Sequence, residues 1–286
     1  MGISLQNVSY SYNKKRKIEN TIFAIKDITL NIEEKDEFIA LVGETGSGKS
    51  TLASIFNALK IPTSGDAVIF GIKIKERRKR SENYNNIRKH VGLVFQFPDY
   101  QLFEESVLKD VMYGPRNFGK KKDEAEKIAK HALELIKFPV DLYDKSPFIL
   151  SGGEKKMASI AGILALESDI LVFDEPTAGL DPETRNKVIN LFKELNQNDH
   201  KSIIVITHDM NIVNEYAKRV LVMNDGKLAF DGTPKDLFSL NKDIVKDSHL
   251  DYPDTYKIAD YLNKNCNMQL DITVKNIDEL YEEIIK

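Results

Sequence analysis

Cysteine is almost absent from this sequence, which has one, Cys266, in 286 residues. A single cysteine excludes an intramolecular disulfide and any metal cluster held by several cysteines, and it fits a reducing compartment. A basic surplus is also lacking, because the formal net charge is −3. Proteins that bind duplex nucleic acid more often carry a net positive charge, so the balance gives no support to that function.

Long apolar runs are lacking as well. The longest charge-free stretches, such as Met157–Leu166, fall well short of the roughly 20 apolar residues that a membrane-spanning helix needs. The N-terminal segment MGISLQNVSY has no basic region followed by an apolar one, so no signal peptide is expected. If the protein acts at a membrane, another chain must therefore hold it there.

Short apolar runs rich in β-branched residues alternate with helical patterns. Runs that are apolar on both faces are typical of buried strands in a mainly parallel sheet. The clearest helical pattern is Asp123–Lys137, where apolar residues recur at helical spacing. This alternation predicts an α/β fold with helices on the faces of the sheet. The expected strands are Phe38–Val42, Val91–Phe95, Ile170–Phe173, Ile203–Thr207 and Val220–Met223.

Both ends of the sequence differ in character from its centre. Ser4–Tyr12 and Phe23–Ile32 alternate apolar and polar residues, which predicts antiparallel strands with one covered face. After residue 233 the sequence is charged, carries no phosphate-binding motif and ends in a predicted helix, Ile277–Ile285. We therefore expect a main domain at residues 1–233 and a small C-terminal appendix, α/β or helical, at residues 234–286.

A basic cluster at Lys73–Arg80 has two interpretations, a nucleic-acid contact or a solvated loop. The solvated loop is favoured, because runs of charge usually face water. Aromatic residues that would stack on single-stranded bases are not interleaved with these lysines and arginines. A nucleic-acid partner is therefore not expected.

The segment after the first buried run carries a phosphate-binding motif. Its sequence GETGSGKST matches G-x-x-x-x-G-K-[ST], and it lies between the strand Phe38–Val42 and a predicted helix, Thr51–Leu59. The glycines let successive backbone N–H groups point at phosphate oxygens. Lys49 supplies a cation for the β- and γ-phosphates of ATP, and Ser50 offers a hydroxyl to Mg²⁺. The predicted ATP-binding residues of this loop are Gly43, Glu44, Thr45, Gly46, Ser47, Gly48, Lys49, Ser50 and Thr51.

Two adjacent carboxylates, Asp174 and Glu175, follow the buried run Ile170–Phe173. The C-terminal ends of strands are where open α/β sheets bind ligands. Asp174 is the expected partner of Mg²⁺, and Glu175 lies where it can polarise an attacking water as general base. Together with the upstream phosphate loop, this pair predicts nucleotide hydrolysis.

A third motif makes a family recognisable. The segment LSGGE at residues 150–154 precedes the acidic pair, while Gln96 and His208 each follow an expected strand. Across residues 3–233 this order closely resembles the ABC ATPase family. The resemblance implies a P-loop NTPase fold with an inserted α-helical subdomain at about residues 97–165. It also implies paired cassettes, in which ATP on the P-loop of one subunit meets the signature motif of its partner. The signature residues are Ser151, Gly152, Gly153 and Glu154.

The resemblance implies further roles. Gln96 is similar to the residue that contacts Mg²⁺ or the lytic water, and His208 to the histidine that holds the γ-phosphate and that water. Tyr12 is similar to the aromatic residue that stacks on adenine, with Tyr10 as its competitor on the same strand face. Glu154 departs from the family pattern, which usually has glutamine at this position. The carboxylate adds a negative charge near the phosphates. The implied catalytic residues are Glu175, His208 and Gln96, and the implied Mg²⁺ ligands are Ser50, Gln96 and Asp174.

Several loops resemble one subgroup, the ATPases of energy-coupling factor (ECF) importers for vitamins or metal ions. This resemblance implies a translocase, in which the chain pairs with a second ABC ATPase beneath a transmembrane coupling protein and a membrane substrate-binding subunit. It implies a peripheral position on the cytoplasmic face of the membrane, and selection of the substrate by the other chains. The segments that carry it are Phe95–Phe103, Glu104–Val107, Tyr113–Pro115, Asn117–Gly119, Pro147–Gly153 and Ala161–Glu167.

Two alternatives stay open. An ordinary ABC importer or exporter ATPase shares every catalytic motif and differs in its membrane partner. A soluble ABC-type ATPase acting on ribosomes or DNA is disfavoured, because the sequence has one P-loop and Leu52–Ile149 shows no sustained heptads of a long coiled coil. A non-enzymatic regulatory module is disfavoured as well, since Lys49, Asp174, Glu175 and His208 are all intact.

Overall fold

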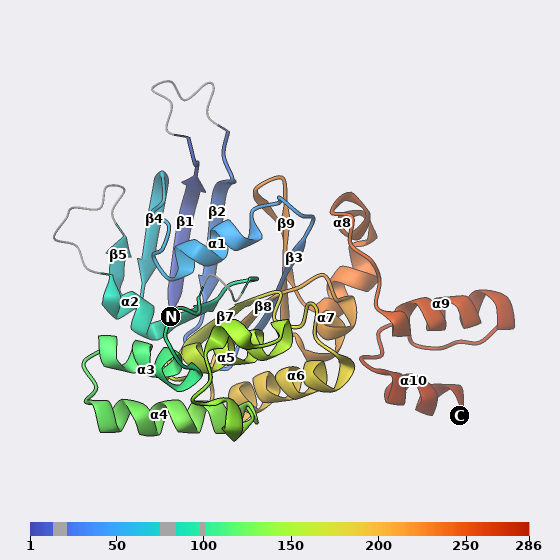
Figure 1. Ribbon diagram of the computed structural model, residues 1–286. Helices are drawn as coiled ribbons and strands as arrows, with labels where there is room; N and C mark the ends of the chain where they lie inside the picture. Colours follow the sequence, from blue (N-terminus) through green and yellow to red (C-terminus); the bar gives the residue numbers. More distant parts are fainter. Residues whose placement is uncertain (14–21, 75–83, 98–100, 286) are drawn as a thin grey trace.

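The computed structural model describes residues 1–13, 22–74, 84–97 and 101–285. Within these residues a six-stranded sheet forms the centre of the molecule, in the order β10-β9-β3-β8-β7-β6 (Figure 1). Neighbouring strands are parallel, except that the edge strand β10 runs antiparallel to β9. The strands are β3 (Phe38–Gly43), β6 (Val91–Val94), β7 (Ile170–Asp174), β8 (Ser202–Ile206), β9 (Arg219–Asn224) and β10 (Lys227–Gly232). The predicted α/β fold with a mainly parallel sheet is therefore confirmed.

Each central strand contributes to a hydrophobic core on both faces of the sheet, because successive side chains of a strand point to opposite faces. Ala40 and Val42 of β3 belong to the core that the helical side covers. Ile39 and Leu41 belong to the core that lies under α1 (Lys49–Phe56) and the antiparallel sheet. Burial on both faces explains why these runs are apolar throughout in the sequence.

An antiparallel sheet in the order β2-β1-β4-β5 covers one side of the central sheet. It contains β1 (Ile3–Tyr10), β2 (Ile25–Ile32), β4 (Ser64–Ile69) and β5 (Ile72–Ile74). The first two confirm the predicted N-terminal pair, with Ile3 opposite Ile32. Lys73 of β5 forms an ion pair with Asp66 at 2.5 Å, whereas residues 75–80 of the basic cluster lie outside the described residues.

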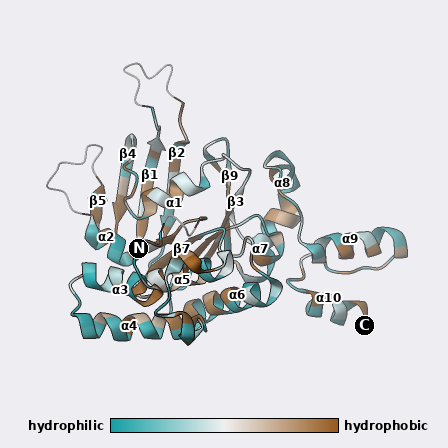
Figure 2. Cartoon of the chain, viewed as in Figure 1, coloured by the Kyte–Doolittle hydropathy of each residue, from teal (hydrophilic) through white to brown (hydrophobic). Residues whose placement is uncertain are grey.

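Helices fill the other side of the sheet and form the inserted helical subdomain (Figure 1). Its helices α3 (Val107–Asn117), α4 (Lys122–Leu135) and α5 (Gly152–Leu164) pack against one another. The buried residues of α4 recur at helical spacing, and Figure 2 shows hydrophilic residues along the helix beside these hydrophobic ones. The remaining helices of the main body are α2 (Asn85–His90), α6 (Pro182–Gln197) and α7 (Met210–Tyr216).

The segment after β10 is helical, the second of the two expected alternatives. A π-helical turn (Asp236–Leu240) leads to α8 (Lys242–Asp247), α9 (Asp254–Cys266) and α10 (Ile277–Ile284). Figure 1 shows α9 and α10 extending to one side of the main body. Ala259 of α9, Leu280 of α10, and Leu270 and Val274 of the segment between the two helices form a small hydrophobic cluster.

Polar contacts attach this C-terminal segment to the main body. Asn214 of α7 donates hydrogen bonds to the carbonyl oxygens of Val274 and Lys275, at 2.8 and 3.0 Å. His249, which follows α8, lies 3.5 Å from the carboxylate of Glu44 in the P-loop. The C-terminal segment therefore contacts both the helical side and the phosphate loop.

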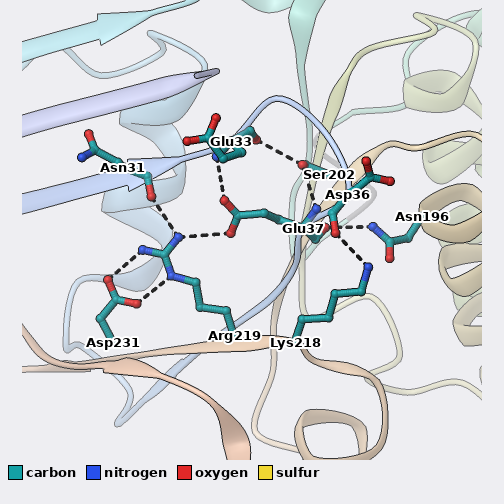
Figure 3. Close-up of polar contacts among 9 residues, drawn as sticks. All are labelled: Asn31, Glu33, Asp36, Glu37, Asn196, Ser202, Lys218, Arg219 and Asp231. Carbon is teal, nitrogen blue, oxygen red and sulfur yellow. Dashed lines mark hydrogen bonds and ion pairs between the residues drawn. The ribbon is translucent and has the colours of Figure 1, made fainter.

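A polar network around Arg219 closes the N-terminal end of the central sheet (Figure 3). The guanidinium of Arg219 donates to both carboxylate oxygens of Asp231, at 2.6 and 2.7 Å. It also donates to Glu37 at 3.1 Å and to the carbonyl oxygen of Asn31 at 2.9 Å. One side chain thus joins β9, β10, β2 and the start of β3. The network further includes Glu33, Asp36, Asn196, Ser202 and Lys218.

Candidate functional site

Most of the predicted site residues line one cleft of about 300 Å³ at the C-terminal ends of β3, β7 and β8. Parallel strands carry the residues that follow them to the same edge of the sheet, so motifs far apart in sequence meet there. The cleft is lined by Tyr12, Ala24, Thr45, Gly46, Gly48, Lys49, Ser50, Thr51, Gln96, Asp174, Glu175 and His208.

The phosphate loop turns sharply into α1 at Gly48. This glycine has a φ of 105°, and a Cβ atom there would lie 2.5 Å from the carbonyl oxygen of Ala24. Such a backbone is open only to glycine. Because Gly48 is itself the N-cap, α1 spans Lys49–Phe56, and the predicted bounds Thr51–Leu59 were wrong at both ends.

Lys49 lies buried at the start of α1. Its ammonium donates to the carbonyl oxygens of Gly43 at 2.7 Å and Glu44 at 2.9 Å. Burial lowers the pKa of Lys49, while the carboxylates of Glu175 and Asp174 oppose that shift. The Lys49 ammonium therefore lies beside the loop whose backbone N–H groups are suited to bind a phosphate.

Asp174 is the last residue of β7 and lies opposite the start of α1. Its carboxylate accepts a hydrogen bond from the Ser50 side chain, and burial raises the pKa of Asp174 in spite of that bond. A carboxylate and a hydroxyl side by side form a pair of hard oxygen donors, which suits Mg²⁺. The predicted Mg²⁺ ligands Ser50, Gln96 and Asp174 all line the same cleft.

Glu175 has an unusual backbone for a non-glycine residue, with a φ of 49°. Its N–H donates to the carbonyl oxygen of Ile206 at 3.0 Å. The side chain is 14% exposed, and burial, followed by repulsion from Asp174, raises the pKa of Glu175 to about 7. A carboxylate with this pKa can accept a proton from water near neutral pH.

His208 follows β8 and faces the same carboxylate. Its Nε2 lies 3.5 Å from Oε1 of Glu175, an oxygen that is buried and has no hydrogen-bond partner among the described residues. Burial, together with the nearby charge of Lys49, lowers the pKa of His208. The imidazole of His208 and the buried carboxylate of Glu175 therefore lie side by side at the cleft.

The structure distinguishes the two candidate aromatic residues. Tyr12 lines the cleft, is 64% exposed, and its hydroxyl lies 3.0 Å from that of Thr51. Tyr10 packs against the hydrophobic core and meets the Tyr12 ring edge-on at 5.2 Å. The aromatic ring at the cleft is therefore that of Tyr12, over which the Lys60 ammonium lies at 5.0 Å from the ring centre.

The signature residues are not among the described residues that line the cleft. Ser151 is the N-cap of α5 and forms a capping box with Glu154. The Glu154 carboxylate accepts the N–H and the hydroxyl of Ser151, both at 2.7 Å. Glutamate is a favoured residue at this third helical position. Glutamine serves at this position of a capping box as well, so Glu154 keeps the helix cap and the structure gives no reason for the added charge.

Sequence reasoning missed a buried lysine next to the acidic pair. Lys156 of α5 is 5% exposed, and its ammonium donates to the carbonyl oxygens of Glu175 at 2.8 Å and Ala178 at 3.1 Å. Lys156 follows Glu154 and Lys155 directly and precedes the apolar segment that starts at Met157, so its place in the sequence gave no sign of burial.

Comparison with known proteins agrees with this geometry. The family described as ABC transporter matches residues 25–178, which is more than half of the chain. The chain belongs to the ABC transporter family. Within the described residues of this ABC transporter chain, helices that combine the length and apolar character of a membrane span are not found.

Relatives of this ABC transporter chain share its full length. The energy-coupling factor transporter ATP-binding protein EcfA2 of Ligilactobacillus salivarius is 44% identical, and the match covers 100% of this chain and 97% of the relative. The protein of the same name from Spiroplasma kunkelii is 40% identical, with 99% and 92% covered.

Solved structures of ABC proteins share the fold. The structure of cbiO1 from Clostridium perfringens, described as part of the ABC transporter complex cbiONQ, has a TM-score of 0.71 and 33% identity, with 93% of this chain and 95% of that chain covered. The dimeric ATP-binding cassette MJ0796 bound to ADP and Pi has a TM-score of 0.72 and 32% identity, covering 81% and 98%.

Proposed function

We propose that this chain is the ATP-hydrolysing subunit of an energy-coupling factor importer for vitamins or metal ions. The convergence of the Lys49 ammonium, the Asp174–Glu175 pair and His208 in one cleft carries the proposal. The relatives named as ECF transporter ATP-binding proteins support the subgroup. The proposed domains are the ATPase at residues 1–233, with its helical subdomain at about 97–165, and the appendix at 234–286.

In this proposal the cleft binds ATP through its triphosphate and its adenine. Backbone N–H groups of the loop and the N-terminal end of α1 hold the phosphates, and Lys49 neutralises the β- and γ-phosphates. Tyr12 stacks on adenine at the mouth of the cleft. Ser50, Asp174 and Gln96 would hold Mg²⁺, which would supply neutralisation of the phosphate charge. Glu175 then orients the attacking water and accepts its proton, while His208 donates a hydrogen bond to the γ-phosphate.

The proposed active unit is a pair of cassettes. The signature residues lie at the N-terminal end of α5, outside the described lining of the cleft. Exposed N–H groups at a helix N-terminus suit phosphate. We therefore propose that they bind ATP held by the P-loop of a second ABC ATPase, in a heterodimer with two sandwiched nucleotides.

An apolar groove of about 360 Å³ supports a membrane partner. It lies between the segment after β6 and the helices α3 and α5, next to Gln96. The exposed rings of Phe103 and Tyr113 meet edge-on at 4.7 Å on its wall. We propose that a transmembrane coupling protein docks here, so that the chain sits peripherally on the cytoplasmic face of the membrane beside a substrate-binding subunit.

The assignment of Glu175 is tested by Glu175→Gln. The variant is expected to bind MgATP as well as wild type and to lose turnover by about 10²-fold or more, because the amide cannot accept the proton of the attacking water. Glu183→Gln, an exposed carboxylate on α6, is the matched control and should hydrolyse ATP normally. Wild-type hydrolysis by Glu175→Gln would contradict the general-base role.

The importer assignment is tested by affinity purification of the tagged chain from gently solubilised membranes, with mass spectrometry of the chains that accompany it. A second ABC ATPase and two membrane proteins, one of them substrate-binding, are the expected result. A single pair of large membrane domains would point to an ordinary ABC importer or exporter. Ribosomal or DNA-repair proteins without a membrane chain would overturn the transporter function and leave the ATPase intact.

A further inference from the structure

The buried ammonium of Lys156 joins two parts of the molecule that the proposed function assigns to different ATP sites. Lys156 lies in α5, whose N-terminal end carries Ser151. Its two described bonds go to the carbonyl oxygens of Glu175 and Ala178, at 2.8 and 3.1 Å. The same helix therefore carries the signature at one end and holds the segment of the proposed general base further along.

Breaking the hydrogen bonds of the Lys156 ammonium costs considerable free energy. Lys156 is 5% exposed, so water is not at hand to replace a lost carbonyl partner, and a buried cation without hydrogen bonds is strongly disfavoured. Hydrogen bonds from a charged donor are also stronger than neutral ones. A small shift of α5 is therefore expected to move the Glu175–Ala178 segment with it.

The backbone conformation of Glu175 depends on the hydrogen bonds that hold this segment. A φ of 49° at a non-glycine residue persists only where surrounding contacts hold it. One support is the bond from its N–H to the carbonyl oxygen of Ile206. The other is at its own carbonyl oxygen, which accepts from the Lys156 ammonium at 2.8 Å and from the Ala178 N–H at 3.3 Å. Because the side chain leaves the same Cα, the position of the carboxylate depends on both supports.

A second contact, between apolar groups, links α5 to the segment that follows Glu175. The side chain of Leu180, two residues beyond Ala178, approaches Gly153 of the signature: a Cβ atom built on Gly153 would lie 3.5 Å from the Leu180 Cδ2. The segment from Glu175 to Leu180 thus contacts α5 at its N-terminal end and again at Lys156. Motion of α5 is transmitted at both points.

We propose that Lys156 is a positioning residue that couples the two ATP sites, because it holds the backbone of Glu175 on the helix that carries the signature. This inference rests on the proposed function, in which Glu175 serves the chain's own ATP and Ser151 serves the ATP of the partner. Engagement of the signature by the partner's ATP fixes α5, and Lys156 thereby fixes the general base in the chain's own cleft.

The test uses the full chain assembled with its partner subunits and measures ATP hydrolysis at saturating MgATP. Lys156→Met is expected to lower kcat by about tenfold, with KM for ATP within about twofold of wild type, because Lys156 is not among the described residues of the cleft. Lys156→Arg, which keeps the cation, should recover most of the rate. Lys193→Met, at an exposed lysine of α6, makes the same charge change and should leave kcat unaltered.

A double-mutant cycle separates coupling from simple destabilisation. If signature engagement acts through Lys156, then Ser151→Ala combined with Lys156→Met should reduce kcat by at least about threefold less than the product of the single effects. Should Lys156→Met fail to fold, Lys156→Gln takes its place in the cycle. Multiplicative effects, or a folded Lys156→Met with wild-type kcat, would overturn the inference. Absence of any Glu175-dependent hydrolysis in wild type would instead refute the proposed function.

Discussion

Replacing Arg219 tests how much the network at the N-terminal end of the sheet stabilises the fold. Arg219→Ala removes the two bonds to Asp231 and the bonds to Glu37 and to the carbonyl of Asn31 (Figure 3). Arg219, Asp231 and Glu37 are 26%, 35% and 18% exposed. The contribution of these contacts to stability is therefore expected to fall between two limits. A surface ion pair contributes about 0–1 kcal/mol, and a buried hydrogen bond to a charged group contributes about 1.5–3 kcal/mol.

The bidentate pair with Asp231 is assigned about 1 kcal/mol, and the more buried contacts with Glu37 and Asn31 about 1–2 kcal/mol together. The expected loss is thus about 2–3 kcal/mol. An unfolding entropy of about 2.1 cal/mol/K per residue gives about 0.6 kcal/mol/K for a chain of 286 residues. Arg219→Ala is therefore expected to lower Tm by about 3–5 °C.

Thermal unfolding followed by circular dichroism measures this change. Arg219→Lys keeps the charge but loses the two-pronged geometry, so it should show about half of the effect. Lys227→Ala, at an exposed lysine of the same hairpin, is the control and should stay within about 1 °C of wild type. ATP affinity should not change, since Glu37 precedes β3 and the P-loop follows it. A Tm for Arg219→Ala within about 1 °C of wild type would refute the reasoning.

Further predictions concern the cleft. Lys49→Ala should weaken ATP binding by at least about tenfold in a fluorescent-nucleotide titration, and unchanged affinity would count against the phosphate cradle. Because Glu175 must be deprotonated to act as base, and burial raises its pKa in the chain without nucleotide to about 7, kcat/KM should rise between about pH 6 and pH 8 and then level off; a flat profile down to pH 5.5 would be inconsistent. Gly48→Ala should abolish ATP binding, since its Cβ would lie 2.5 Å from a carbonyl oxygen, whereas Gly46→Ala meets nothing within 4 Å and should retain more binding in the same titration.

The sheet and its motifs could be predicted because their signals are local. The strand before the P-loop is apolar on both faces, and every residue of β3 is buried. Asp174 ends a parallel strand, and Lys49 and His208 come soon after one, so the topology alone brings them to one edge. The order of these motifs was therefore enough to predict the cleft, while the roles of its residues stay predictions.

Strands β4 and β10 could not be predicted with the same ease. Strand β4 begins Ser64-Gly65 and mixes exposed with buried positions, and β10 alternates half-buried and exposed residues. Neither has the continuous apolar run of a central strand. The helix α6 was not identified either, although Asp181 followed by Pro182 is a helix start that the structure uses as N-cap and first residue.

Contacts that depend on tertiary structure could not be predicted from the sequence. The left-handed backbone of Glu175 and the bonds of Lys156 form only in the folded chain, where α5 and β8 both meet the segment that follows β7. The capping box of Ser151 and Glu154 had a sequence signature, but the position was interpreted as a departure from a family pattern. The cap and a phosphate contact are compatible, so the capping box leaves the predicted role of the signature unchanged.

The separate apolar cluster of the C-terminal segment has a consequence for how the molecule opens. Ala259, Leu270, Val274 and Leu280 pack together apart from the large cores of the central sheet. So small a cluster can give its helices little local stability, and such units open before the rest of a protein. Amide hydrogens of α9 and α10 are thus expected to exchange with solvent long before those of β3, which makes this segment a foldon of its own.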